Sequence, residues 1–219
     1  MKTVAASSFP QTAVSEADVE RVVAVLHSLC RRLHKPLPAA FFEALSYSLR
    51  RQELPKATVL VAAGSFPDRV YFLTGGSAVA YDGDRGDGVL WIRRTGDFIL
   101  PDSLPNREKS HYTAIMEQEG TVLSISAEAY WHCCEAYPDT WRLTVLWLLA
   151  MRKREYERLT AIRSAASVAE RICWLLQQWD DALAVFPDAI LASYLETTRE
   201  WLNKQKDAGL GLYRATRHR

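Results

Sequence analysis

The sequence has little of what a metal site, a redox centre or a membrane span would need. It holds four cysteines in 219 residues, and no pair of them has the C-x-x-C spacing of a zinc or iron–sulfur site. No window approaches the roughly 18 uninterrupted apolar residues of a membrane helix, and no signal peptide begins the chain. We therefore expect a cytoplasmic protein without membrane contact. Free buried thiols, with a redox-sensing pair as the lesser alternative, are expected at Cys30, Cys133, Cys134 and Cys173.

Histidine is scarce where a metal-dependent β-roll enzyme would need it. Residues 54–125 contain only His111 and no H-x-H pattern, whereas a cupin-like enzyme needs clustered His and carboxylate ligands on adjacent strands. We expect no enzyme, with no catalytic residues, no metal and no cofactor. A haem-ligand role for His111 or His132 stays a minor alternative.

An excess of charge of one sign is also absent. The chain has 27 Lys+Arg against 26 Asp+Glu, a formal net charge of +1, which argues neither for nor against nucleic acid. The distribution is more informative, because residues 199–219 carry six basic side chains against Glu200 and Asp207. Such a basic end suits a local phosphate contact, although a solvated tail from Arg214 onward is the alternative.

Helical and β-rich patterns follow one another along the first half. Residues 15–34 have apolar side chains at helical spacing, and Ser15 with Asp18 forms an approximate capping box. A second helix is predicted over residues 39–51. From residue 54 to 125, short β-rich runs alternate with glycine-containing turns about every ten residues, which predicts an antiparallel sandwich or roll.

After residue 127 the pattern returns to helices, over residues 127–137 and then over one long helix, 139–164. The long helix has apolar residues on two sides. One side carries Trp141, Val145, Leu148, Leu159 and Ile162, and the other carries Leu143, Leu146, Trp147 and Ala150. Such a helix needs two partners, its own β domain and a second copy of the chain, so we expect a homodimer. Burial within a single chain is the alternative.

Residues 186–206, FPDAILASYLETTREWLNKQK, are typical of two short helices joined by a tight turn. That layout is a helix-turn-helix, which places its second helix in the DNA major groove. Leu191, Leu195 and Leu202 lie at core-facing positions. Ala192 lies where the two helices cross closely and only a small side chain fits.

The order of roll, long helix and helix-turn-helix resembles the Crp/Fnr family of bacterial regulators. The segments LPKATVLVAAGSFPDRVYFLTGGSAVAY, GDFILPDSL, SVAERICWLLQQW and LASYLETTREWLNKQK carry the likeness, over about residues 54–206. The resemblance implies an α+β fold: an antiparallel, jelly-roll-like cyclic-nucleotide-binding roll, a long dimerisation helix and a C-terminal helix-turn-helix. The implied domains are a sensor over residues 1–137, a dimerisation helix over 138–164 and a DNA-binding domain over 165–219.

By resemblance, Arg199, Glu200 and Lys204 match the positions that read bases. Their chemistry fits, since Arg pairs with guanine O6 and N7, Glu accepts from cytosine N4, and Lys takes guanine or phosphate. An ordinary solvated helix face is the alternative. The full predicted DNA-binding set is Thr198, Arg199, Glu200, Asn203, Lys204 and Lys206.

The helix-turn-helix departs from the family pattern at four points. Glu196 occupies a turn position usually held by glycine, at a cost of about 1 kcal/mol. Gln205 replaces Ile or Leu, and would bury an amide or loosen the helix end. Trp201 replaces a small hydroxyl residue and would pack on the preceding helix or lie on the DNA backbone. The final segment, AGLGLYRATRHR, allows at most a short strand where the family has a hairpin wing, with Arg214 and Arg217 able to reach phosphates.

The effector cassette departs further. Family members that bind cyclic nucleotides have a Gly-Glu pair for the ribose and an Arg before a small residue for the phosphate. This chain reads Ile-Leu-Pro-Asp-Ser-Leu after Phe98 and Lys109-Ser110-His111 where the Arg belongs. We therefore predict no cyclic-AMP binding, and a different small molecule or none. The weak candidates for effector contact are Asp97, Arg107 and His111.

Together these patterns predict a dimeric, sequence-specific DNA-binding transcription regulator with a β-roll sensor. The expected partners are a pseudo-palindromic duplex operator, a second copy of the chain and an unidentified small-molecule effector, with RNA polymerase as a further candidate. The alternative is an effector-binding or protein-interaction module of the same fold that has lost DNA recognition.

Overall fold

The computed structural model describes residues 4–33, 38–83 and 88–217. The chain divides into two compact units, Met1–Ala150 and Met151–Arg219. The division lies inside helix α4 (Asp139–Ser164), whose bounds match the predicted long helix. The predicted domain limits at residues 137 and 164 stay predictions.

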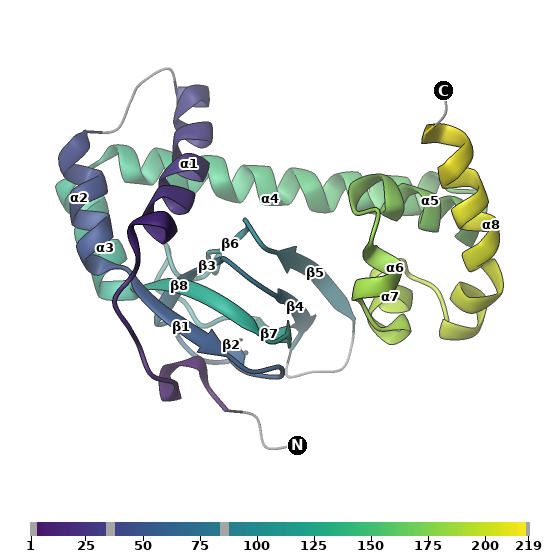
Figure 1. Cartoon of the computed structure of the whole chain (residues 1–219), viewed down its shortest axis with the longest axis horizontal. Helices are drawn as coiled ribbons and strands as arrows, with labels where there is room; N and C mark the ends of the chain where they lie inside the picture. The colour runs from purple at the N-terminus through teal and green to yellow at the C-terminus, as the bar shows by residue number, and fades with distance from the viewer. Residues whose placement is uncertain (1–3, 34–37, 84–87, 218–219) are drawn as a thin grey trace. The chain divides into compact units, whose positions relative to one another are not determined.

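The first unit begins with three helical segments, η1 (Ala6–Ser8), α1 (Glu16–Leu33) and α2 (Ala39–Ser48) (Figure 1). The predicted capping box of α1 is confirmed. The Asp18 backbone N–H donates to Ser15 Oγ at 3.2 Å, and the Ser15 N–H donates to Asp18 Oδ2 at 3.4 Å. His34, the last residue of the predicted segment, lies outside the described residues.

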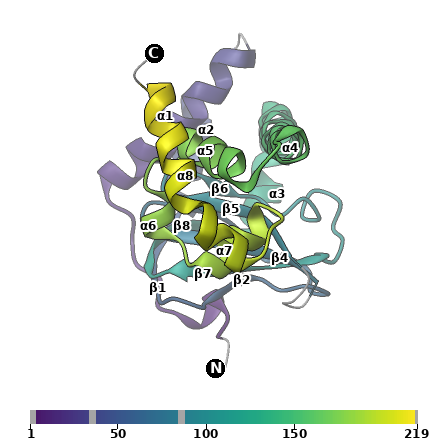
Figure 2. The same ribbon diagram turned by 90° about the vertical axis from the view of Figure 1, so that its right-hand side faces the viewer.

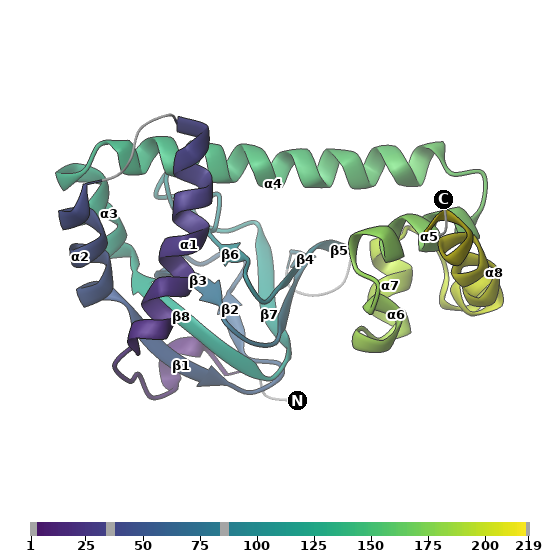
Figure 3. The same cartoon turned by 45° about the horizontal axis from the view of Figure 1, so that its top comes forward.

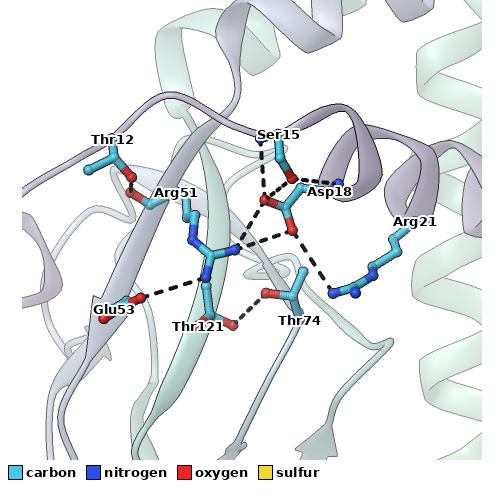
Figure 4. Close-up of polar contacts among 8 residues, drawn as sticks. All are labelled: Thr12, Ser15, Asp18, Arg21, Arg51, Glu53, Thr74 and Thr121. Carbon is cyan, nitrogen blue, oxygen red and sulfur yellow. Dashed lines mark hydrogen bonds and ion pairs between the residues drawn. The ribbon is translucent and has the colours of Figure 1, made fainter.

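Figure 4 shows how this cap is tied to the first strand. Arg51 Nη1 donates to both Asp18 carboxylate oxygens, at 3.1 and 3.3 Å, and Arg21 Nη1 lies 4.0 Å from Oδ1. Burial alone would raise the pKa of Asp18, but hydrogen bonds from Ser15 and Arg51 outweigh burial and hold the pKa below its usual value. Asp18 is therefore a buried, charged link between α1 and the sheet.

The predicted antiparallel roll is confirmed as two four-stranded sheets. One has the order β1-β8-β3-β6 and the other β2-β7-β4-β5, and the paired strands within them are all antiparallel. The strands are β1 (Arg50–Leu54), β2 (Val59–Val61), β3 (Arg69–Leu73), β4 (Ser77–Asp82), β5 (Val89–Arg94), β6 (Phe98–Ile99), β7 (Tyr112–Gln118) and β8 (Gly120–Ser126).

The second helix is shorter than its predicted range, 39–51, which was wrong at its end. α2 ends at Ser48, Leu49 is extended with ψ 139°, and β1 starts at Arg50. Arg50 pairs with Ser124 of β8. Pairing in the sheet overrides a helical apolar spacing, a competition that local sequence does not reveal.

Side chains fill the space between the two sheets. Ala6 of the N-terminal segment belongs to this core, and Gln52 Nε2 fixes that segment by donating to Ala6 O at 3.0 Å and Phe9 O at 3.1 Å. The other buried members are Leu54, Leu60, Val61, Tyr71, Leu73, Ala78, Ala80, Ile99, Tyr112, Ala114, Met116 and Val122. The interior of the roll is thus a packed core.

Two glycines let the turn after β3 pack against the turn before β8. Gly76 has φ 81°, and a Cβ there would lie 2.7 Å from Glu119 O. A Cβ on Gly120 would lie 2.1 Å from Gly75 O. A side chain fits at neither position, so glycine is required at both.

The β1-β8-β3-β6 sheet carries helices on the face away from the roll core. α3 (Ala127–Ala136) follows β8, and with the first part of α4 it lies over this face beside α1 and α2 (Figures 1 and 3). Ser126 caps α3, since its Oγ accepts from the Ala129 N–H at 3.1 Å. Alternate side chains of β3 face opposite ways, Leu73 into the roll and Phe72 toward the helices.

Three of the four cysteines have described side chains, and all three are free and buried, as predicted: Cys133, Cys134 and Cys173. Burial raises the pKa of Cys134 to about 11, so its thiol is neutral near pH 7. The side chain of Cys30 lies outside the described part of the chain.

The second unit is helical. It contains the last part of α4 and helices α5 (Val168–Gln178), α6 (Ala182–Val185), α7 (Asp188–Tyr194) and α8 (Arg199–Arg217). Figure 2 shows α8 lying along α5. A Cβ on Gly209 would lie 2.6 Å from Ile172 Cγ2, so glycine at this position permits the close approach of the two helices.

α8 corrects the prediction for the end of the chain. We predicted at most a short strand after residue 206, but the helix continues through Arg217. The buried residues Leu202 and Gly209 both lie on α8, and the segment after residue 206 holds no proline to stop a helix. Arg219, counted in the basic end, lies outside the described residues.

Candidate nucleic-acid interface and sensor loop

A turn at residues 195–198 joins α7 to α8 and sets the direction of α8. The Thr197 N–H donates to Ala192 O at 2.9 Å, and the Glu196 N–H donates to Ser193 O at 3.1 Å. This pair of bonds is the Schellman motif, which needs a left-handed residue just past the helix end. Glu196 takes that conformation, with φ 51°. The predicted position with positive φ is therefore confirmed, although glutamate occupies it.

Two arginines from other helices bind the carbonyl groups of this turn. Arg171 Nη1, on α5, donates to Leu195 O at 3.0 Å and Glu196 O at 2.8 Å. Arg158, on α4, is 7% exposed; its Nη1 donates to Tyr194 O at 2.7 Å and its Nε donates to Glu155 Oε2 at 3.1 Å. These cations satisfy the carbonyls left over at the end of α7, where the helix dipole is negative.

Sequence reasoning missed both arginines. Arg158 lies one turn before Ile162 of the predicted apolar stripe, and that position on the helix was the available signal. Its guanidinium also lies 4.7 Å from the centre of the Tyr194 ring, a cation–π contact. The signal for Arg171 was weaker, because an arginine on an amphipathic helix is usually solvated.

The predicted core positions of the helix pair are confirmed. Leu191, Leu195 and Leu202 are fully buried, and Ala192 is 3% exposed. Gln205 is half-buried, and α8 continues beyond it without a break. The amide at this position therefore does not end the helix.

The six predicted DNA-binding residues divide into three groups. Arg199, Glu200, Asn203 and Lys204 are exposed on α8. Thr198 precedes the helix and caps it, because its Oγ1 accepts from the Trp201 N–H at 3.2 Å.

Lys206 is half-buried, and its Nζ lies 2.5 Å from Asp188 Oδ1 at the start of α7. This ion pair links the two helices of the motif. The structure therefore gives Thr198 and Lys206 a role in holding α8, and leaves the other four side chains facing outward.

The outer face of α8 also carries an aromatic ring and further basic residues. Trp201 is 54% exposed, and Lys204 Nζ lies 5.5 Å from the centre of its ring. Farther along, Arg214 is exposed, whereas Arg217 pairs with Asp180 at 3.6 Å. Basic groups thus follow the helix along its length, and an amphipathic ring lies beside Lys204.

An apolar stripe is exposed on the first half of α4. Trp141, Val145 and Leu149 are 37%, 51% and 60% exposed, at a spacing of four residues. Ile162, predicted for the same stripe, is 2% exposed and belongs to the core of the second unit. Leu148 of the predicted stripe is half-buried. The predicted stripe was wrong at its far end, because a repeat of 3.5 residues drifts by about 60° over three heptads of a helix with 3.6 residues per turn.

Asp97, the first effector candidate, closes the turn between β5 and β6. Its Oδ2 accepts from the Arg94 N–H at 3.1 Å, its own N–H donates to Arg94 O at 2.9 Å, and its carbonyl accepts from Leu73. These are the contacts of a turn residue that fixes backbone.

Arg107 and His111 lie on the loop between β6 and β7. Arg107 is exposed, has φ 55°, and places its guanidinium 4.6 Å from the centre of the Trp131 ring on α3. His111 is exposed and its ring contacts the neighbouring Tyr112 ring at 5.1 Å. Each side chain thus contacts a different aromatic ring, and the assignment of the three candidates to one effector site stays a prediction.

The loop itself, residues 100–111, is described throughout and contains no helix. Ser110, at the centre of the sequence where the family has its arginine and small residue, is 2% exposed and donates from Oγ to Tyr112 O at 2.8 Å. A buried phosphate is usually held by helix N-terminal amides and a guanidinium. At this place the loop has turns instead, and the Ser110 hydroxyl is bonded to the backbone of Tyr112.

Comparison with known proteins agrees with this geometry. Residues 51–137 match the family model of the cyclic nucleotide-binding domain. The roll has the cyclic nucleotide-binding domain fold. No curated protein sequence matches the chain.

Solved structures extend the likeness beyond the roll. A protein assigned to the Crp/Fnr family of transcriptional regulators, from Eubacterium rectale, has TM-score 0.62 at 16% identity, covering 77% of this chain and 82% of its own. FixK2 from Bradyrhizobium japonicum has TM-score 0.60 at 17% identity, covering 73% and 83%. CLP from Xanthomonas campestris, described as a c-di-GMP-responsive global regulator, has TM-score 0.59 at 16% identity, covering 78% and 90%. The predicted resemblance to Crp/Fnr regulators is confirmed at the level of fold.

Among the described residues, none of the helices combines the length and apolar character of a membrane span. Within the same residues, no three His, Cys, Asp or Glu side chains gather closely enough to hold a metal ion.

Proposed function

We propose that this protein is a homodimeric, sequence-specific DNA-binding transcription regulator with a β-roll sensor and no enzymatic activity. One observation carries the proposal: a Schellman turn, bound by Arg158 and Arg171, presents a helix whose outer face carries Arg199, Glu200 and Lys204. Solved regulators of the same fold support it.

The exposed side chains of α8 suit the major groove. Arg199 and Lys204 can donate to guanine, and Glu200 can accept from the amino group of cytosine. Asn203 offers both a donor and an acceptor. The exposed Arg214 is suited to phosphate, which positions a protein on the duplex without reading its sequence.

A second copy of the chain is proposed to cover the exposed stripe of Trp141, Val145 and Leu149 on α4. Large apolar side chains next to one another on a surface mark an interaction site, and two-fold dimers are the commonest oligomers. A two-fold pair would offer two copies of α8 to half-sites about 34 Å apart, that is, to a pseudo-palindromic operator.

The sensor is proposed to act without cyclic AMP. The loop at residues 100–111 has Lys109-Ser110-His111 where the family has its arginine, its Arg107 is out of register, and no helix begins within it. Asp97 is bonded within a turn. An unidentified effector would bias two states of the dimer. RNA polymerase is the further partner proposed, in the cytoplasm.

The test compares two lysine variants of the full chain by fluorescence anisotropy with labelled promoter duplexes. Lys204→Ala should weaken binding about tenfold and relax base preference, whereas Lys153→Ala removes another exposed lysine, on α4, and should change little. Equal affinity and equal base preference in both variants would remove the role assigned to α8.

The alternative function is an effector-binding or protein-interaction module without DNA recognition. The engagement of Lys206 by Asp188 and the helix where the family has a wing favour it. Measuring the affinity for random duplex DNA at several salt concentrations separates the two functions. A DNA-binding protein loses affinity steeply as salt displaces its phosphate contacts, whereas a pure sensor shows no such binding.

A further inference from the structure

An apolar cavity of about 100 Å³ lies in the first unit, outside the packed interior of the roll. It lies between the helix-facing side of strands β3, β6 and β8 and helices α1, α2, α3 and α4. Phe72 lines this cavity, whereas the next residue, Leu73, belongs to the roll core on the other face of the sheet. Of the loop that carries Arg107 and His111, only its first residue, Leu100, lines the cavity.

Three hydroxyl groups at its wall are hydrogen-bonded within the protein. The Tyr130 hydroxyl and Thr144 Oγ1 lie 2.8 Å apart in a hydrogen bond, and Thr140 Oγ1 donates to Cys133 O at 3.2 Å. A buried water needs two to four polar partners, and a cavity whose wall is almost wholly carbon does not supply them. The space is thus suited to an apolar occupant.

The size of the cavity sets the size of that occupant. Apolar cavities of about 150 Å³ in protein cores stay dry and take up benzene or xenon. Three lining residues are only half-buried, Leu26, Phe98 and Leu100, and they mark the side from which a molecule could enter. We propose that this cavity binds a compact, uncharged, apolar molecule about the size of a benzene ring.

The position of the cavity gives such binding a structural effect. Thr140, Leu143, Thr144 and Trp147 of α4 line it, and the Trp147 ring contacts the Phe98 ring at 5.2 Å. An occupant would therefore hold the first turns of α4 against the sheet. This binding goes beyond the regulator function and does not require it, since all the lining residues belong to the first unit.

The test uses the full chain, with benzene as the probe and no DNA. Titration should shift the NMR methyl signals of lining residues such as Leu143 and Ile125, and should slow hydrogen exchange at residues 140–147. Benzene at ten times its dissociation constant should raise the unfolding midpoint by about 3 °C, because a ligand stabilises the state to which it binds.

Two variants and a control make the result specific. Leu143→Phe fills the cavity and should weaken benzene binding at least tenfold, whereas Leu212→Phe makes the same change on an exposed site of α8 and should not. Leu26→Ala alters a half-buried wall residue, should fold, and should admit p-xylene.

Saturating benzene that moves no methyl signal of the lining residues would overturn the proposal and identify the cavity as a packing defect. Binding that persists unchanged in Leu143→Phe would overturn it as well, because the probe would then lie elsewhere. Both readouts are independent of DNA, so failure of the regulator assignment would leave this result intact.

Discussion

The turn at residues 195–198 and the loop at residues 100–111 both depart from the sequences usual in regulators of this fold, yet they differ in what surrounds them. At the turn, Glu196 occupies the left-handed position that favours glycine, Arg158 and Arg171 bind the carbonyls, and the Schellman bonds form. At the loop, no helix forms, and Arg107 lies on the Trp131 ring. A local backbone geometry can therefore form without its usual local sequence when side chains far away in the chain bind it.

The largest expected effect comes from removing one of those distant side chains. Arg158→Ala should lower the free energy of unfolding of the second unit by about 3 kcal/mol, because it leaves the Tyr194 carbonyl buried without its charged donor. Urea unfolding followed by circular dichroism measures this. Arg163→Ala, an exposed change on the same helix, should cost less than about 0.5 kcal/mol. Equal losses in the two variants would show that the turn does not depend on Arg158.

The cap of α1 is a third region for comparison, because there the capping box predicted from the sequence forms as expected. Asp18→Asn should cost about 1.5 kcal/mol near pH 7, because the carboxylate accepts from Ser15 and Arg51. The folded pKa of Asp18 is lowered from its ordinary value of 3.8, so its contribution is complete above that pH and is lost as pH falls through the folded pKa. The difference in free energy of unfolding between the wild type and the variant should therefore disappear in acid.

Denaturation of both proteins between pH 7 and pH 2.5 measures that gap. Glu16→Gln, an exposed change on the same turn, is the control and should show little gap at any pH. A gap for Asp18→Asn that stays constant down to pH 2.5 would contradict the assigned charge.

A smaller effect tests the strain at the turn. Glu196→Gly should stabilise the second unit by about 0.5 kcal/mol, since glycine adopts φ 51° without the penalty of a side chain while losing more entropy on folding. Glu200→Gly, inside α8, should instead destabilise by about 1 kcal/mol. Thermal unfolding of the two variants compares them, and the same sign for both would show that Glu196 is not strained.

The smallest effect is expected in the loop. Arg107→Gly relieves a similar conformation, φ 55°, but removes the contact with Trp131, so the two changes should nearly cancel, to within about 0.5 kcal/mol. Urea unfolding of the first unit measures it. A loss above about 1.5 kcal/mol would erase the contrast between the two regions, because the loop would then depend on Arg107 as the turn depends on Arg158.

Much of the fold could be predicted from residues close together in sequence. Ser15 with Asp18 predicted the start of α1, and glycines at regular spacing predicted the antiparallel roll. The end of α2 could not be predicted, because it depends on pairing between β1 and β8, which are far apart in the chain. The length of α8 also depends on packing, in this case against α5 through Gly209.

In the candidate site, too, features set by residues close in sequence could be predicted, and features set by distant contacts could not. Exposure of Arg199, Glu200, Asn203 and Lys204 follows from the helical period, and the sequence predicted it. The binding of Lys206 to Asp188, and of Arg171 to the turn carbonyls, joins residues 18 and about 25 positions apart. No short-range pattern reveals which of several basic residues will be used to hold the motif together.

Selection of bound sequences from a random duplex pool by the full chain, with affinities measured at several salt concentrations, tests the central claim most directly. The regulator account predicts enrichment of a two-fold symmetric site with half-sites about 34 Å apart, and a steep fall of affinity with salt. Recovery of the pool unchanged, with no salt-dependent affinity for any duplex, would contradict it.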